Sequence, residues 1–233
     1  MYMYFENASL KLLSLPKRLM DFCLTPILWW DRLEKERAIQ LLPLTFRKHM
    51  LRLLFIPTLL WNYFLHLLQR DRRWWDKVDN TVILGACPMP WQVQKLAQMG
   101  VTGVVNCTDE YSGPIKQYTK AGIKQLRIPT MDFHVPSMQH IDMALQFIKG
   151  QDGMVYVHCK AGRGRAATVV ACWLVSEQQL TPMEAQNKLK HIRPHISPSL
   201  WKRDVVKQTY EKRASRGSAS ETCHSILISE DMG

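Results

Sequence analysis

The fold of this chain is decided by residues 155–165, which read VYVHCKAGRGR. Alternating β-branched and aromatic residues predict a buried strand that ends at His158. A loop with two glycines follows Cys159, and Arg165 comes six positions after that cysteine. Residues 166–175 are largely apolar, with the length and spacing of a helix. The sequence therefore predicts a strand, a tight loop and a helix in direct succession.

A loop between a strand and a helix N-terminus turns successive backbone N–H groups toward an anion. Gly162 and Gly164 permit the backbone angles that we expect such a cradle to need. Arg165 can clamp phosphate oxygens through two hydrogen bonds. In that field the pKa of the Cys159 thiol should fall, which makes it a nucleophile at neutral pH. The pattern predicts phosphoryl transfer through a phosphocysteine, in preference to a buried cysteine with a chance arginine nearby.

His158, Cys159, five residues and Arg165 resemble the His-Cys-x5-Arg signature of the cysteine-dependent protein tyrosine phosphatase superfamily. The preceding segments resemble its dual-specificity branch, and most of all the mitochondrial phosphatidylglycerophosphate phosphatases, from Leu51 to Tyr210. We expect an α/β fold with a mixed, mainly parallel central sheet flanked by helices, and a helical apolar N-terminal extension. The expected phosphate-binding residues are Lys160, Ala161, Gly162, Arg163, Gly164 and Arg165.

A phosphate ester needs a proton donor for its leaving oxygen. Asp132 lies in a loop after a predicted strand and before a predicted helix, and such loops can close over a site. The resemblance implies that Asp132 is the general acid. A helix-capping or solvated aspartate is the structural alternative. Asp142 is the competing carboxylate, but it falls inside the predicted helix 138–149.

Further residues are expected to support the site. The resemblance implies an acidic pair followed by tyrosine after the second strand, and Asp109, Glu110 and Tyr111 match it, whereas Ser112 replaces the final acid. We expect Glu110 and Tyr111 to shape the site, against the alternative of a plain turn ended by glycine and proline. His158 is expected to support the cysteine that follows it.

Two features of the loop bear on substrate and rate. Lys160 and Arg163 add cations that suit an anionic headgroup, unless Lys160 points to solvent. Ala166 stands where the superfamily usually has a serine or threonine hydroxyl, and Thr168 follows two positions later. Losing one hydrogen bond to a charged group costs about 1.5–3 kcal/mol, so slower turnover is expected but not lost chemistry.

Composition narrows the partners. The six cysteines are irregularly spaced, which favours reduced thiols. The patterns of nucleotide-binding loops and of metal sites are missing from the sequence, so neither a cofactor nor a metal is expected. A net charge of +11 indicates anionic partners. No zinc-finger or RNA-binding motif is present, so an anionic membrane surface is favoured over nucleic acid.

Three regions are expected: an apolar and basic extension (1–73), a phosphatase domain (74–213) and a disordered tail (214–233). Leu53–Leu68 is predicted to be a helix that lies in a membrane interface, spans the membrane or packs on the domain. Through the resemblance alone, the mitochondrial inner membrane is the expected location, and the cytoplasm the alternative. Met50 is a second candidate start.

The sequence as a whole predicts hydrolysis of a phosphate monoester, with an anionic phospholipid such as phosphatidylglycerophosphate as substrate. A dual-specificity phosphatase acting on phosphoproteins is the alternative. A slow phospho-binding module is a further one. The sequence leaves the oligomeric state open.

Overall fold

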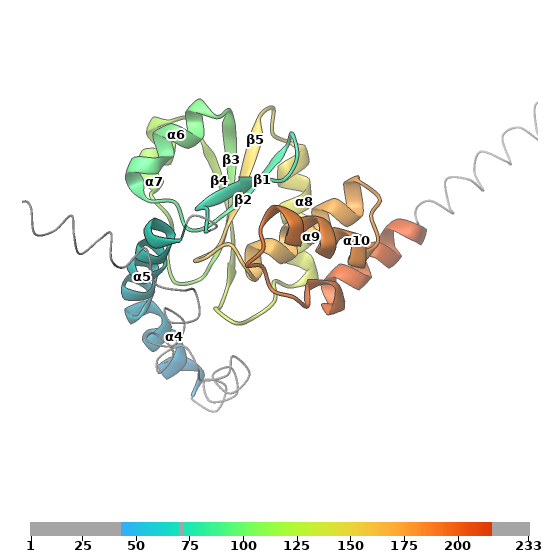
Figure 1. Ribbon diagram of the computed structural model, residues 1–233, viewed down its shortest axis with the longest axis horizontal. Coiled ribbons are helices and arrows are strands. Elements are labelled where there is room, and N and C mark those ends of the chain that lie inside the picture. Colours follow the sequence, from blue (N-terminus) through green and yellow to red (C-terminus); the bar gives the residue numbers. More distant parts are fainter. Residues whose placement is uncertain (1–42, 70–71, 216–233) are drawn as a thin grey trace, which may run out of the picture. The chain divides into compact units, whose positions relative to one another are not determined.

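The computed structural model describes residues 43–69 and 72–215 (Figure 1). A five-stranded sheet, in the order β1-β2-β5-β3-β4, runs through the compact unit that begins at Lys48. β1 pairs antiparallel with β2, and the other neighbours are parallel. The predicted α/β fold with a mixed, mainly parallel sheet is confirmed. The strands are β1 (Trp75–Lys77), β2 (Val82–Gly85), β3 (Val101–Thr108), β4 (Lys124–Thr130) and β5 (Met154–His158).

β5 lies in the middle of the sheet, between β2 and β3. Its last four residues are buried, because both faces of a parallel sheet are covered by helices. In the register, His158 stands opposite Gly85 of β2 and Asn106 of β3. The segments that leave these three strands therefore start side by side at one edge of the sheet.

Helices cover both faces of the sheet (Figure 1). α6 (Val93–Gln98), preceded by η1 (Pro90–Gln92), and α7 (Ile115–Lys120) pack on one face around Ile83, Val104 and Tyr156. The other face carries α8 (Met138–Lys149), α9 (Arg165–Glu177), α10 (Pro182–Ile192), η2 (Leu200–Lys202) and the helical residues 204–215. The larger hydrophobic core lies on this second face.

The strand predicted to end at His158 and the helices predicted over 138–149 and 166–175 are present as β5, α8 and α9. The capping box at Thr181 and Glu184 is formed, with proline in the first turn of α10. β1 and α7 were not predicted. β1 has three residues and no alternating pattern, and α7 has six residues of which only Tyr118 is buried. Segments this short carry too little hydrophobic periodicity to be recognised.

Two helices precede the sheet, α4 (Leu44–Leu53) and α5 (Phe55–Leu68). The helix predicted over Leu53–Leu68 is present as α5, but it begins at Phe55, and Leu53 is the last residue of α4. One face of α5 packs into a small core, where Phe55 and Leu59 join Trp74, Ala86, Cys87 and Met89. The domain boundary expected at residue 73 therefore falls inside the compact unit. The expectations for residues 1–42 and 216–233 lie outside the described part of the chain, and residues 214–215 continue the last helix.

Candidate active site

The candidate site assembles at the carboxyl edge of the sheet. Residues 159–165, here called the signature loop, leave β5 and end at the start of α9. Glu110 follows β3, and Asp132 follows β4. Parallel strands deliver their following loops to one edge, so three segments far apart in the sequence meet there.

Every carbonyl oxygen from Lys160 to Gly164 accepts a hydrogen bond on the outer side of the signature loop. The Cys87 N–H donates to the Lys160 carbonyl (3.2 Å), and the Ser197 N–H donates to the Arg163 carbonyl (2.9 Å). Arg193 donates from Nε to the Gly162 carbonyl (3.0 Å) and from Nη2 to the Ala161 carbonyl (3.1 Å). The Gly164 carbonyl accepts from the Thr168 hydroxyl (2.8 Å), from the Thr168 N–H (2.9 Å) and from Arg203 (3.2 Å).

This outward bonding fixes where the N–H groups point. The C=O and N–H of a trans peptide unit point in opposite directions, so the N–H groups of residues 161–165 face away from these partners. The Gly162 and Ala166 N–H groups bond to Cys159. The inner side of the loop is therefore a set of converging donors, which is the geometry of an anion cradle.

The two loop glycines differ in what they permit. Gly162 has a φ of 67°, in the left-handed region, and a Cβ there would lie 2.4 Å from the Gly85 carbonyl oxygen. Gly164 has a φ of −114°, and a Cβ would meet nothing closer than Arg203 at 3.9 Å. The expected need for glycine holds at Gly162 alone, because only there do both conformation and space exclude a side chain.

Cys159 is buried at the base of the cradle. Burial raises the pKa of its thiol, but the charge of Arg165 and the N–H groups of Ala166 and Gly162 outweigh this, and the pKa is lowered overall. A thiolate held in this way is a nucleophile. His158 is also buried, and burial lowers its pKa to about 3, so the imidazole beside the cysteine is neutral.

Arg165 is held by carboxylates from two loops. Its Nη1 donates to Glu110 at 2.9 and 3.2 Å and to the Thr130 carbonyl at 2.7 Å. Its Nη2 lies 3.0 Å from Asp132 Oδ1 without forming an aligned hydrogen bond. Glu110 also accepts from the Asp132 N–H (3.2 Å), so it orients both residues. One edge of the guanidinium is fixed by aligned hydrogen bonds, and the other lies beside Asp132, with which a phosphate would compete for Nη2.

Asp132 lies inside the site, not at a helix cap. Its Oδ2 is 2.6 Å from Lys160 Nζ, and the Lys160 side chain is 16% exposed, so this lysine does not point to solvent. Burial raises the pKa of Asp132, but Arg165 and Lys160 lower it further, and the net shift is downward. Asp142 lies on α8, where it pairs with Lys212. Of the two candidate carboxylates, the structure brings only Asp132 to Cys159 and Arg165.

Two further predicted residues, Tyr111 and Thr168, support the loops around the site. Tyr111 packs its ring on Phe55 of α5, with centroids 5.6 Å apart. Its carbonyl accepts from Asn106 (3.0 Å) and Thr108 (2.7 Å), which shapes the turn that carries Glu110. The Thr168 hydroxyl donates to the Gly164 carbonyl and accepts from Arg203, so it supports the end of the loop and does not replace the hydroxyl that Ala166 lacks.

One residue that binds two of the loop's five outward carbonyls is not predicted from the sequence. Arg193 is buried at the end of α10 and donates from Nη1 to Asp76 Oδ2 (2.7 Å) and to the Arg73 carbonyl (2.9 Å). A basic residue near a helix C-terminus is common, because it favours the helix dipole. The sequence therefore gave no sign that Arg193 contacts a loop 31 residues away.

Comparison with known proteins agrees with this geometry. Residues 82–211 match the family model of the dual specificity phosphatase catalytic domain. The chain belongs to the dual-specificity phosphatases. It is accordingly a cysteine-dependent phosphatase, a hydrolase of phosphoric monoesters.

Relatives of this phosphatase share more than the domain. The phosphatidylglycerophosphate phosphatase PTPMT1 of Arabidopsis thaliana is 37% identical over 185 residues, which are 76% of this chain and 55% of that relative. The phosphatidylglycerophosphatase and protein-tyrosine phosphatase 1 of Mus musculus is 35% identical over 72% of this chain and 93% of its own length. A crystal structure of PTPMT1 in complex with PI(5)P has a TM-score of 0.57 and 33% identity, and covers 62% of this chain and 99% of that one.

Proposed function

We propose that this phosphatase acts through Cys159, Arg165 and Asp132. The Cys159 thiolate attacks phosphorus and forms an S–P bond, while the bond from phosphorus to the ester oxygen breaks. Asp132 gives its proton to the leaving oxygen. A water molecule then attacks the phosphocysteine and gives a proton back to Asp132, which releases inorganic phosphate and the thiolate. The cradle of loop N–H groups around Cys159 is the observation that carries this proposal.

The proton on Asp132 depends on the bound phosphate. Without substrate, the charges of Arg165 and Lys160 keep the pKa of Asp132 low, so its carboxyl is ionised. A phosphate in the cradle neutralises Arg165 and adds negative charge beside Asp132. Both effects raise the pKa of Asp132 and favour the protonated acid that the first step needs.

The proposed substrate is an anionic phospholipid, with phosphatidylglycerophosphate as the first candidate. Two relatives are phosphatidylglycerophosphate phosphatases by name, and the related PTPMT1 crystal holds a phosphoinositide. The loop cations Lys160 and Arg163 suit a headgroup with more than one negative charge. A phosphoprotein is the second candidate, since the mouse relative is also named a protein-tyrosine phosphatase.

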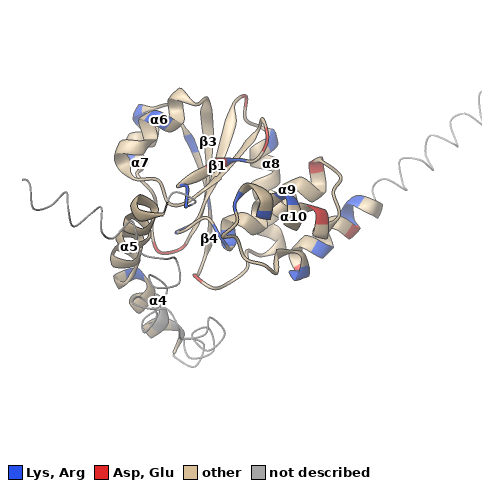
Figure 2. Cartoon of the chain, viewed as in Figure 1, with Lys and Arg blue, Asp and Glu red and all other residues tan. Residues whose placement is uncertain are grey.

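We also propose that α5 holds the enzyme at a membrane surface, the mitochondrial inner membrane being favoured by the family resemblance. α5 carries no Lys, Arg, Asp or Glu (Figure 2). Large apolar side chains are exposed along one side of it, namely Ile56, Leu60, Trp61, Phe64, Leu67 and Leu68. Within residues 43–69 and 72–215, no helix is both long and apolar enough to cross a membrane. An interfacial helix fits these properties.

The two faces of α5 give a direct test of the membrane proposal. Leu60→Gln, Phe64→Gln and Leu67→Gln combined should weaken binding to phosphatidylglycerol vesicles by about tenfold or more, because apolar area no longer enters the interface. The melting temperature of this triple variant should stay close to that of the parent protein. Leu59→Ala, on the packed face, should instead cost about 2–5 kcal/mol of stability. Unchanged vesicle binding by the triple variant would refute the membrane role of α5.

The substrate is tested by phosphate release from a panel of phospholipids and phosphopeptides, with Cys159→Ser as the blank. The lipid proposal expects a higher kcat/KM for phosphatidylglycerophosphate in vesicles than for any phosphotyrosine peptide. The reverse order would make the protein a phosphoprotein phosphatase. Binding without turnover would indicate the phospho-binding module.

A further inference from the structure

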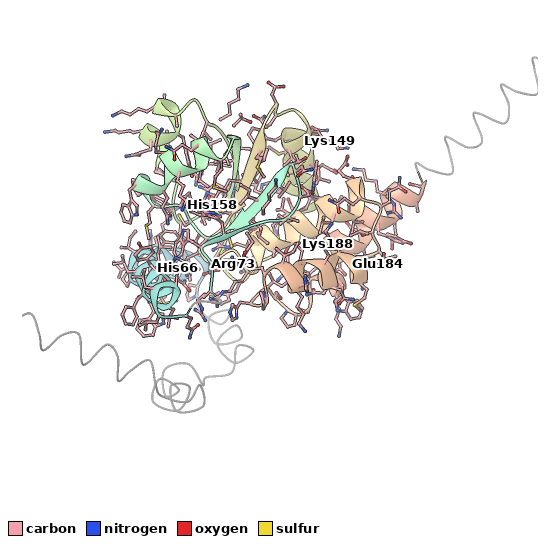
Figure 3. The ribbon with its side chains drawn as sticks, turned by 45° about the horizontal axis from the view of Figure 1, so that its top comes forward. His66, Arg73, Lys149, His158, Glu184 and Lys188 are labelled. Carbon is pink, nitrogen blue, oxygen red and sulfur yellow. The ribbon has the colours of Figure 1, made fainter. Side chains whose placement is uncertain are left out.

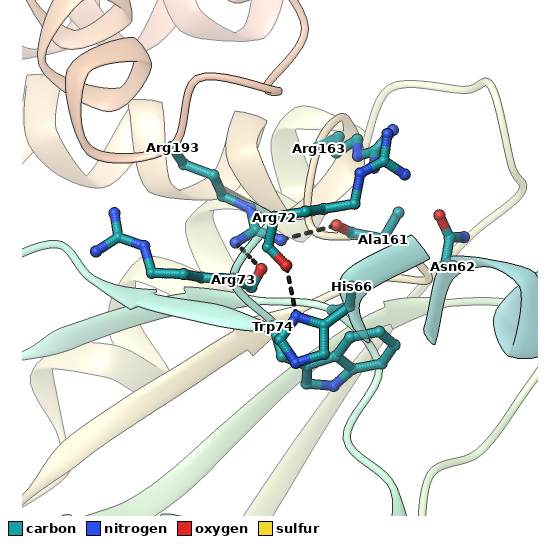
Figure 4. A pocket seen from close by; sticks show the side chains of 9 residues that line it. Asn62, His66, Arg72, Arg73, Trp74, Ala161, Arg163 and Arg193 are labelled. Carbon is teal, nitrogen blue, oxygen red and sulfur yellow. Dashed lines mark hydrogen bonds between the residues drawn. The ribbon is translucent and has the colours of Figure 1, made fainter. Parts of the chain in front are cut away.

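A second cluster of cationic side chains lies beside the signature loop. Arg72, Arg73, Arg163 and Arg193 line one small hollow, together with Asn62 and His66 of α5 (Figure 4). The arginines come from three segments: the approach to β1, the signature loop and the end of α10. His66 and Arg73 also lie close to each other in the wider view (Figure 3). The hollow thus joins α5 to the outer side of the loop.

Positive charge exceeds negative charge in this hollow. Among the described residues that line it, none is acidic. Two of these arginines share one carboxylate, since Asp76 Oδ1 lies 2.6 Å from Arg73 Nε and Asp76 Oδ2 lies 2.7 Å from Arg193 Nη1. Arg73 and Arg193 thus share one negative charge, and Arg72 adds a further guanidinium beside them, so a bound anion would be favoured.

Arg72 is the member least satisfied by the protein. Its Nε is buried and has no hydrogen-bond partner within the described part of the chain. Burial and the charge of Arg193 lower its pKa, which means that its charged form is held at a cost. The His66 Nδ1–H donates to the Arg72 carbonyl at 2.5 Å, so α5 fixes the backbone that carries this side chain. An anion would supply the missing partner and relieve the repulsion.

We propose that this hollow is a second anion site, which binds the phosphate group of an anionic phospholipid while the signature loop holds the scissile monoester. The proposal rests on the lipid phosphatase function. The hollow is small and partly open to solvent, with room inside for about one water molecule, so a phosphate would lie at its mouth and a drug-sized ligand would not fit. Asn62 and His66 belong to the helix whose opposite side exposes apolar residues, so the hollow would lie near the headgroups of a membrane that α5 contacts.

The phosphate could belong to the substrate molecule itself or to a neighbouring lipid, and two assays separate these sources. Arg72→Gln is compared with Lys124→Gln, which removes an equal charge from the exposed start of β4. The first assay measures KM for a short-chain, monomeric phosphatidylglycerophosphate, relative to the same variant's KM for an aryl phosphate. The second measures binding of the Cys159→Ser protein, with and without Arg72→Gln, to phosphatidylglycerol and phosphatidylcholine vesicles.

If the site takes the substrate's own phosphodiester, Arg72→Gln should raise the relative KM by about tenfold, the value of one charge-assisted hydrogen bond. If it takes a neighbouring lipid, the variant should lose about fivefold in affinity for phosphatidylglycerol vesicles and nothing on phosphatidylcholine. Equality with Lys124→Gln in both assays would overturn the site. The vesicle assay needs no turnover, so it stands even if the enzyme hydrolyses no lipid.

A fold control accompanies these assays. Arg72→Lys keeps the charge and loses the planar fork, so it should retain vesicle binding better than Arg72→Gln. Circular dichroism melting of each variant shows whether the domain is intact. If both Arg72 variants melted early yet bound vesicles like the parent, the residue would be structural, and the proposal would be rejected.

Discussion

The inner and outer sides of the signature loop are made of different chemistry. The inner side presents N–H groups, Cys159 and Arg165 to a phosphate, and these are the groups that we propose take part in the reaction. The outer side presents carbonyl oxygens to Arg193, Ser197, Cys87 and Arg203, and these contacts hold the loop in shape. The residues behind the loop therefore shape the cradle, because the hydrogen bonds to the outward carbonyls set the direction of the inward N–H groups.

The largest expected effect lies on the inner side. Cys159→Ser removes the thiolate, and Arg165→Lys replaces the planar clamp by a point charge. Each should lower kcat/KM roughly 10⁴-fold or more while the melting temperature stays close to that of the parent. Phosphate release measures the first quantity and calorimetry the second. More than a few per cent of residual activity would contradict the phosphocysteine mechanism.

Asp132→Ala should have the next largest effect on rate. General-acid catalysis contributes about 10²–10⁴-fold, so alkyl phosphates should lose that much and an activated aryl phosphate much less. Inorganic phosphate should inhibit the variant at lower concentration, because Asp132 no longer competes for Arg165 Nη2. Equal losses on both substrates would remove Asp132 from the role of proton donor.

The outer side is tested by Arg193→Met. This change leaves Asp76 with an exposed partner alone and releases two loop carbonyls, which should cost about 3–5 kcal/mol of unfolding free energy. Unlike the inner variants, it should lower stability and kcat together. Lys188→Met on the same helix, where the lysine contacts Gln178, is the matched control. If Arg193→Met reduced activity without any loss of stability, the division into a reacting side and a holding side would fail.

Lys160→Met gives the smallest expected effect, a shift in pH dependence. Lys160 lowers the pKa of Asp132, so its removal raises that pKa. A higher pKa keeps Asp132 protonated to higher pH, so the descending limb of the plot of kcat/KM against pH should shift to higher pH. Lys124→Met is the control. A downward shift would mean that Lys160 acts on another group.

The features that could be predicted from the sequence are those set by interactions between residues close together in the chain. The signature loop, its strand and its helix lie within about two dozen residues, and their pattern is set by backbone sterics and periodicity, which act between near neighbours. The capping box of α10 is likewise a local hydrogen-bonding pattern. Sequence alone therefore determined the α/β fold, the residues of the loop and the family to which they belong.

Tertiary structure decided what long-range contacts control. It placed Asp132 and Glu110 on Arg165, turned Lys160 to Asp132, and bound the loop from behind through Arg193. It also packed one face of α5 on the domain and left the other face exposed. Composition cannot distinguish those two faces, because both carry large apolar side chains. Only the packing of the chain decides which apolar side chains are buried and which guanidinium meets which carboxylate.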